Sequence, residues 1–100
     1  MQSHYPASFE RDMACTEAEW LAWLPKAMGD HDWQCSDQTV QVRLQGGGRL
    51  QIEWKVLPPR TIALMRLPRM GMVFRFEEAD DQARLQFMRR FDLTTQRGGG

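Results

Sequence analysis

The chain has 100 residues, which corresponds to one domain of ordinary size. Its 13 lysine and arginine residues balance 13 aspartate and glutamate residues, so the formal net charge is zero, which excludes a uniformly basic nucleic-acid coat and an acidic solvating tail. No stretch approaches the roughly 18 consecutive apolar residues of a membrane helix, so we expect no membrane partner.

The two ends of the chain and its two cysteines bear on location. The N-terminus has neither the basic region nor the apolar region of a secretory signal, so we expect a cytoplasmic protein. In that compartment Cys15 and Cys35 are expected to stay reduced. The glycine-rich residues 96–100 have nothing to bury and are expected to form a disordered tail after a single domain of residues 1–95.

The clearest predicted helix follows Thr16. Thr16 and Glu19 have the spacing of a capping box, in which each side chain accepts a hydrogen bond from the backbone of the other residue. Apolar residues then recur with roughly helical spacing, and Gly29 is a suitable stop. Pro25 lies inside this stretch, so we expect it to kink the helix or to end it near Leu24.

Strands are predicted on both sides of this helix. Residues 7–14 fit a short edge strand before it, and residues 29–37 after it form a polar turn. Apolar and polar residues then alternate with the period of two that is typical of a half-buried strand. Turns are expected at Gly46–Gly48, at Pro58–Pro59 and at Pro68–Arg69. The four strands predicted between and around these turns are residues 40–45, 50–56, 61–67 and 70–76.

The three turns agree on one register. If each closes an antiparallel hairpin, all three place the same apolar set on one face, whereas a one-residue slip would reverse the alternation. The Pro58–Pro59 loop then pairs Ile52 with Met65, and the Pro68–Arg69 turn pairs Leu64 with Val73. The predicted apolar face carries Val40, Val42, Leu44, Leu50, Ile52, Trp54, Val56, Ala63, Met65, Leu67, Met70, Met72, Phe74 and Phe76.

A second helix completes the predicted fold. Acidic residues at positions 77–81 suit the start of a helix, whose dipole favours negative charge there, and Phe87, Met88 and Phe91 form its apolar stripe. We therefore predict a two-layer α+β domain, in which a four-stranded antiparallel meander sheet with a fifth N-terminal edge strand carries both helices on one face, in the order β-α-β-β-β-β-α. This order is similar to one half of the TATA-binding-protein-like fold, a likeness of architecture alone.

The uncovered face of the predicted sheet combines an apolar centre with a cationic rim. Seven basic residues between positions 43 and 75 stand against the single acid Glu53. An ordinary solvated face can carry a few aliphatic residues, but an apolar centre with arginines around it is typical of a contact surface. We expect a homodimer or an unidentified protein partner to use it. The candidate interface residues are Ile62, Leu64, Val73, Arg66, Arg75, Lys55 and Arg43.

Other interpretations remain open at this stage. Large side chains between helices and sheet could surround an apolar ligand, although filling the core is the simpler outcome. The basic segment could contact nucleic acid, but the aromatic residues of the strands fall on the helix-covered face, and stacking on bases needs exposed rings. No catalytic or cofactor motif is present, so we expect a non-enzymatic protein without a cofactor. Metal-ligand residue types without a standard zinc spacing occur at Asp30, His31, Asp32 and Cys35.

Overall fold

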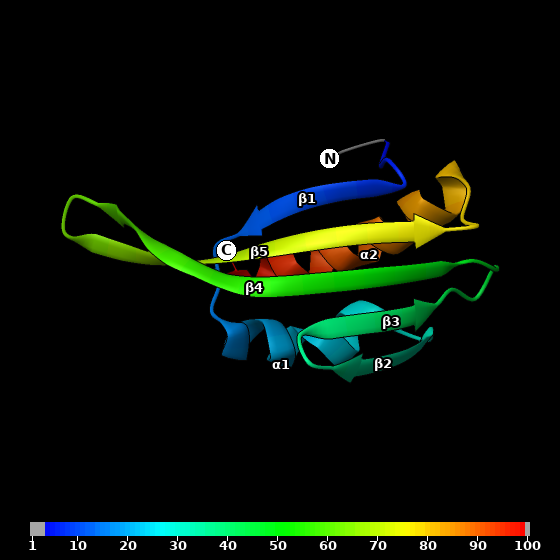
Figure 1. Cartoon of the computed structure of the whole chain (residues 1–100), viewed down its shortest axis with the longest axis horizontal. Helices are drawn as coiled ribbons and strands as arrows, with labels where there is room; N and C mark the ends of the chain where they lie inside the picture. The colour runs from blue at the N-terminus through cyan, green and yellow to red at the C-terminus, as the bar shows by residue number, and fades with distance from the viewer. Residues whose placement is uncertain (1–3, 100) are drawn as a thin grey trace.

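The computed structural model describes residues 4–99, apart from the side chains of residues 97–99, and in this range five antiparallel strands form one open sheet (Figure 1). Their spatial order is β1-β5-β4-β3-β2. The predicted α+β class and the order β-α-β-β-β-β-α are confirmed, with β1 at one edge of the sheet. The elements are β1 (Ser8–Met13), α1 (Glu17–Met28), β2 (Asp32–Ser36), β3 (Thr39–Arg43), β4 (Arg49–Ile62), β5 (Met65–Glu77) and α2 (Asp81–Gly99).

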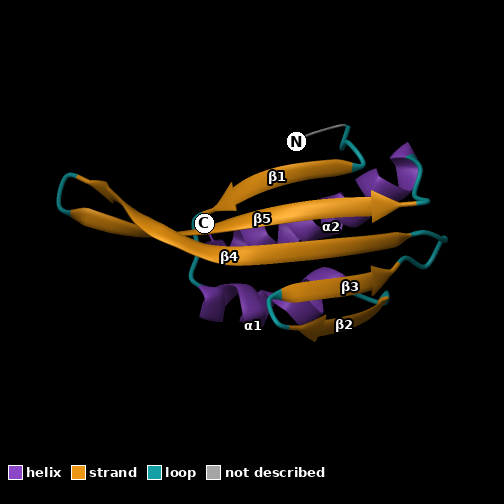
Figure 2. Ribbon diagram, viewed as in Figure 1, coloured by secondary structure: helices purple, strands orange, loops and turns teal. Residues whose placement is uncertain are grey.

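Both helices cover the same face of the sheet, as predicted, so the molecule has two layers (Figures 1 and 2). Aromatic rings meet between the layers: the Trp20 ring centroid lies 5.7 Å from those of Trp54 and Phe91, and Phe74 lies 5.2 Å from Phe91. These contacts fill the core with ring surface. The predicted apolar face is confirmed at Val40, Val42, Leu44, Leu50, Ile52, Trp54, Met70, Met72, Phe74 and Phe76, all of which are buried.

Helix α1 begins as the sequence predicts and ends later than it predicts. The Thr16 hydroxyl accepts a hydrogen bond from the Glu19 N–H at 3.1 Å, and the Glu19 carboxylate accepts one from the Thr16 N–H at 2.9 Å. The expected end or kink near Leu24 is wrong in its end point, because α1 runs through Pro25 to Met28. Proline removes one hydrogen bond, but the last turn is held by Met28, which is fully buried.

Helix α2 begins at Asp81, four residues after Glu77, the first residue of the acidic run. Glu77 is the last residue of β5 and binds Arg49 at 2.9 Å, so its predicted place at the helix start is wrong. The side chain of Asp80 accepts a hydrogen bond from the Ala83 N–H at 2.9 Å and caps the helix. The disordered tail predicted for residues 96–100 is not tested, because residue 100 and the side chains of residues 97–99 lie outside the described part.

The main correction concerns the β4–β5 pairing. Neither Pro58–Pro59 nor Pro68–Arg69 is a turn; both lie inside one long hairpin whose turn is at Ala63–Leu64. Ile52 therefore pairs with Phe74, so its predicted pairing with Met65 is wrong. The faces of the inner segments were still predicted correctly, because alternation alone decides which side chains share a face.

Two further expectations fail for related reasons. The residues predicted as a polar turn at 29–37 contain β2, which pairs with β3 through a two-residue turn at Asp37–Gln38. Both turn residues have positive φ, +51° and +66°, as the tight hairpin turn that suits sheet twist requires.

Val56 and Met65 were expected in the core but are mostly exposed, since the sheet continues past the helices at these positions.

Candidate functional site

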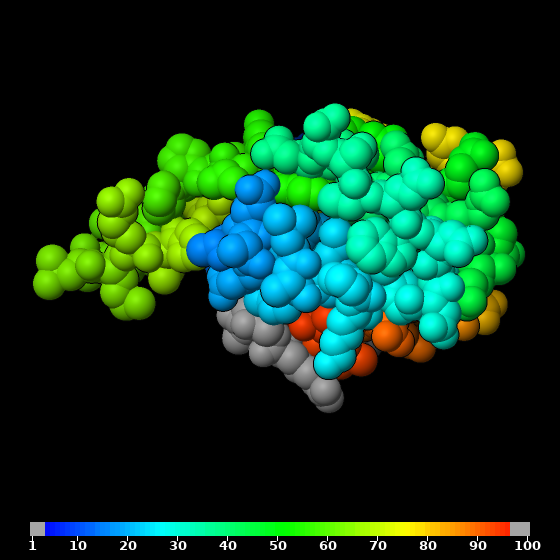
Figure 3. Space-filling view, turned by 90° about the horizontal axis from the view of Figure 1, so that it is seen from below, coloured from blue at the N-terminus to red at the C-terminus, as the bar shows by residue number. Residues whose placement is uncertain are grey.

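The β4–β5 hairpin extends beyond the other strands and projects from the body of the protein (Figures 1 and 3). We name residues 56–69 the arm. In the body, buried and accessible residues alternate along β4 as far as Trp54 and along β5 from Met70 onwards. Between these two positions no residue is buried. Leu57 and residues 67–69 at the base are half-buried, and residues 58–66 are all exposed, so both faces of the outer part of the arm are open to solvent. The molecule accordingly measures 46 Å along its longest axis, against 29 and 21 Å along the others.

The arm exposes large apolar side chains at its tip. Leu64 is 100% exposed at the turn, and Ile62 and Met65, which are partners across the hairpin, are 53% and 61% exposed. Val56 at the base is 59% exposed. Single exposed aliphatic residues are common on proteins, but a group of them on one projecting element is typical of a contact site.

Two backbone features give the arm its shape. Two residues, Pro58 and Pro59, lie opposite the single residue Pro68. This two-against-one arrangement is a bulge in the hairpin. A bulge tolerates proline because the extra residue makes no ladder hydrogen bond. At the turn, Ala63 has a φ of +54°, a left-handed conformation that alanine adopts at a cost and that favours glycine or asparagine.

The arginines of the arm differ from one another in their ion pairing. Arg69, at the base of the arm, binds Asp12 of β1 at 2.7 Å, and Arg75 in the body pairs with Glu53. Within the described residues, Arg60 and Arg66 make no ion pair, and the arm contains no acidic residue. Two unneutralised guanidinium groups therefore stand beside the exposed apolar side chains.

The structure brings together only part of the predicted interface. Ile62, Leu64 and Arg66 lie within the arm, around its turn. Val73 lies in the body, beside β1, so its predicted pairing with Leu64 is wrong. The pairing fails because the chain reverses at Ala63–Leu64, five residues before the predicted turn.

The other predicted interface residues lie in the body of the sheet. Arg75 is ion-paired, Lys55 lies opposite Gly71, and Arg43 lies opposite Arg49 at the end of the sheet away from the arm. They do not surround Ile62 and Leu64, so the predicted rim of cations is not assembled.

Sequence reasoning missed three residues of the arm. Arg60 was assigned to a loop, and Val56 and Met65 were assigned to the core. One signal pointed to them: no acidic residue occurs between Glu53 and Glu77, although acids are otherwise frequent. The cations of this stretch therefore have no acidic partner within it.

The open face of the sheet body is mixed in charge rather than basic. Arg49 pairs with Glu77, Arg69 with Asp12 and Arg75 with Glu53, so three cations are neutralised within the molecule. The aromatic side chains of β4 and β5 are buried under the helices. Nucleic-acid binding depends on uncompensated cations and on exposed stacking rings, and this face offers few of either.

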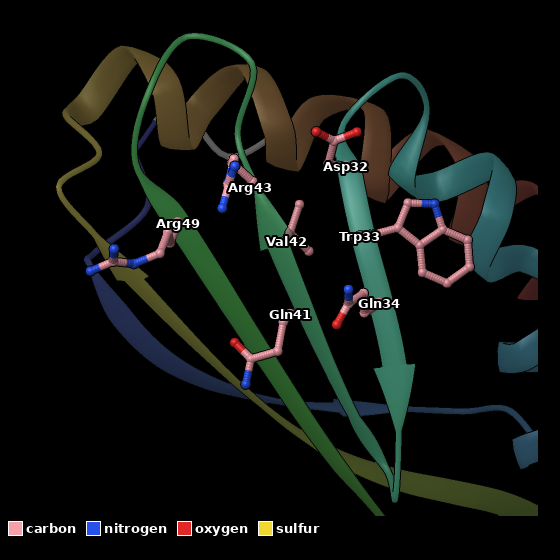
Figure 4. Close-up of a pocket in the computed structure, with 7 residues that line it drawn as sticks. All are labelled: Asp32, Trp33, Gln34, Gln41, Val42, Arg43 and Arg49. Carbon is pink, nitrogen blue, oxygen red and sulfur yellow. The ribbon is translucent and has the colours of Figure 1, made fainter.

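A shallow hollow lies over β2 and β3, and the close-up in Figure 4 shows polar side chains around it. Arg43 and Arg49 are direct cross-strand partners there, an arrangement in which like charges repel. Asp32 lies opposite Arg43 on the other side, and Glu77 pairs with Arg49, so the charges compensate one another. The hollow is therefore a weaker candidate than the arm.

The metal-ligand residue types near the α1–β2 connection do not form a cluster. Within the part of the chain that the structure describes, no three histidine, cysteine, aspartate or glutamate side chains gather as ligands. The His31 Nδ1 instead accepts a hydrogen bond from the Gln45 N–H at 3.0 Å. Burial, and then the positive charge of Arg90, lower the pKa of His31, which favours its neutral form.

The cysteines are not joined to each other. Cys15 is buried and Cys35 is exposed, and both are free thiols. Burial, and then the negative charge of Glu19, raise the pKa of the Cys15 thiol, which disfavours a reactive thiolate there.

Comparisons with known proteins identify no relative: no family model matches the chain, and no curated protein or solved structure shows significant similarity to it. Neither helix of the described chain is both long and apolar enough to cross a membrane.

Proposed function

We propose that this protein is a non-enzymatic interaction module that binds a protein partner through its arm. The single observation that carries the proposal is the end of burial alternation at Trp54. Beyond it, strand geometry continues, but no residue is buried before Met70, and residues 58–66 are exposed on both faces. A two-stranded hairpin gains little stability by itself in water. A projecting hairpin with exposed apolar side chains is therefore well suited to bind a partner whose surface covers those side chains.

The energetics favour contact at the tip. Burying a leucine or isoleucine side chain fully is worth about 1.5–3 kcal/mol, and Leu64 begins from full exposure. Arginine and large apolar residues are the types that dominate binding energy at protein interfaces. The alternative of an apolar ligand between helices and sheet is less well supported, because the ring of Phe91 already contacts those of Trp20 and Phe74 there.

The experiment compares two leucine substitutions. Leu64→Asp places a charge at the tip, and Leu93→Asp makes the same change on α2, where Leu93 is 48% exposed and lies outside the arm. Tagged wild-type protein and both variants are used to capture partners from a nuclease-treated extract of the cells that produce the protein. We expect Leu64→Asp to lose the captured protein and Leu93→Asp to keep it. Equal capture by both variants would show that the arm is not the binding element.

Light scattering across a concentration series tests whether the partner is a second copy. A dimer that forms with wild type and not with Leu64→Asp would identify self-association through the arm. A monomer at all concentrations directs attention to another protein. We also propose a cytoplasmic location, which the two free thiols support.

A further inference from the structure

We infer that the arm inserts into a cleft of another protein that is lined by apolar side chains and carboxylates, and that it is held there by its side chains rather than by strand addition. This inference rests on the proposed function and specifies the chemistry of the partner. Three features of the arm carry it: its uncompensated charge, the placement of that charge on both faces, and the prolines in its strands.

The first feature is charge. Three acidic residues beside β5 are already ion-paired, since Asp12, Glu53 and Glu77 pair with Arg69, Arg75 and Arg49. A fourth, Glu10, lies opposite Val73 in the body of the sheet. Within the described chain, Arg60 and Arg66 have no such partner. An arginine fork binds a carboxylate with two parallel hydrogen bonds, which combines strength with geometric selectivity. The complementary surface is therefore acidic.

The second feature is that the two arginines lie on different faces. Arg60 pairs across the hairpin with Leu67, whereas Arg66 pairs with Thr61. Partners across a hairpin share a face, and adjacent residues along a strand point to opposite faces. Each face of the arm thus carries one arginine, and the apolar tip lies between them. A flat surface would contact one face only, whereas a cleft with two walls contacts both.

The third feature distinguishes insertion from strand addition. The outer edges of the arm are unpaired, because the pairing of β3 with β4 ends at Glu53 and that of β1 with β5 ends at Met70. Pro58, Pro59 and Pro68 lie in these edges and provide no N–H donor. Proline on an edge is a known protection against added strands. Recognition consequently falls to the side chains.

The same features argue against two other occupants. A second copy offers an identical arm, and pairing two arms would set Arg60 and Arg66 of one copy near those of the other. Nucleic acid would satisfy the arginines, but it takes many cations to give useful affinity at physiological salt, and the arm supplies three with Arg69, which is already paired.

The experiment identifies what touches the tip. The full chain carries the photo-crosslinking residue p-benzoylphenylalanine in place of Leu64, is produced in its source cells, and is irradiated there. A second chain with the same residue in place of Leu93 reports background. The double variant Arg60→Glu, Arg66→Glu tests the charge, and Arg43→Glu, Arg89→Glu is its matched control, since these exposed arginines lie outside the arm.

We expect the tip to crosslink to a different protein, at a peptide that contains aspartate or glutamate beside apolar residues. Reversal of the arm charges should reduce the crosslink at least tenfold, and the control reversal should leave it within twofold. A crosslink to another protein that is unaffected by the charge reversal overturns this inference but leaves the proposed function standing. A crosslink to nucleic acid or to a second copy also overturns this inference. No crosslink above background overturns both.

Discussion

Replacing two isoleucines of the same strand by alanine would test whether the arm is independent of the core. Ile52 lies in β4 under the helices and is fully buried, with Val40 and Phe74 as its neighbours on either side. Ile62 lies ten residues further along the same strand and is 53% exposed. The chemical change is identical, so only the surroundings differ.

The expected costs differ several-fold. Replacing a buried isoleucine by alanine lowers the free energy of unfolding by about 2–5 kcal/mol. The cost of Ile52→Ala should fall in the middle of this range, because the neighbouring side chains have little room to collapse into the cavity. A loss of about 3 kcal/mol lowers the Tm of a domain of this size by roughly 12–24 °C. At Ile62, whose partner across the hairpin is Met65, less than half of the side chain is covered, so Ile62→Ala should cost about 1 kcal/mol or less.

Urea unfolding followed by tryptophan fluorescence measures both variants, because Trp20 and Trp54 are buried and report loss of the core. Ile52→Ala should shift the midpoint strongly with an unchanged slope, and Ile62→Ala should shift it little. If Ile62→Ala cost as much as Ile52→Ala, the tip would be packed against the body in solution. The reasoning about an uncovered arm would then be wrong.

Three further changes test local features. Ala63→Gly should stabilise the protein by about 1 kcal/mol because it relieves the left-handed conformation at the turn, and a lower Tm would contradict this origin. Thr16→Ala should cost about 1 kcal/mol through loss of the cap of α1, while Thr16→Ser should keep most of the stability; equal losses in both would refute the capping role. The lowered pKa of His31 means that the unfolded chain binds its proton more readily, so the stability from His31 is present above pH 6.5 and is lost as pH falls below that value. His31→Gln should reduce the change in the urea midpoint between pH 7.5 and pH 5.5. If the midpoint of the variant changed with pH as much as that of the wild type, the pH dependence would come from other groups.

The sequence predicted the features that depend on residues within one helix or strand. The cap of α1 needs only Thr16 and Glu19, and the burial of the inner strands needs only their alternation, so both are predictable. The short strand β2 carried the same alternation, with Trp33 and Cys35 between polar residues, but the surrounding turn-forming residues obscured it.

The arm could not be predicted because its key features depend on position in the sheet. Two adjacent prolines end a central strand, which needs every N–H, but an unpaired edge tolerates them as a bulge. The sequence does not indicate which segments lie at an edge. The turn gave no signal either, since Ala63–Leu64 contains neither glycine nor asparagine. Consequently Ile62, Leu64 and Arg66 were predicted in the wrong surroundings, beside Val73 and Arg75 instead of around the turn of the arm.

An uncovered arm also separates recognition from folding. In most small domains, a large apolar residue that contributes to binding also contributes to the core, so its loss weakens both. Here the residues around Leu64 contact little of the body, and the core is complete on the other side of Trp54. Substitutions at the tip should therefore change the affinity for a partner while the free energy of unfolding stays nearly constant. A loss of binding caused by Leu64→Asp can then be attributed to the contact itself, because the isoleucine pair independently measures how little the arm supports the fold.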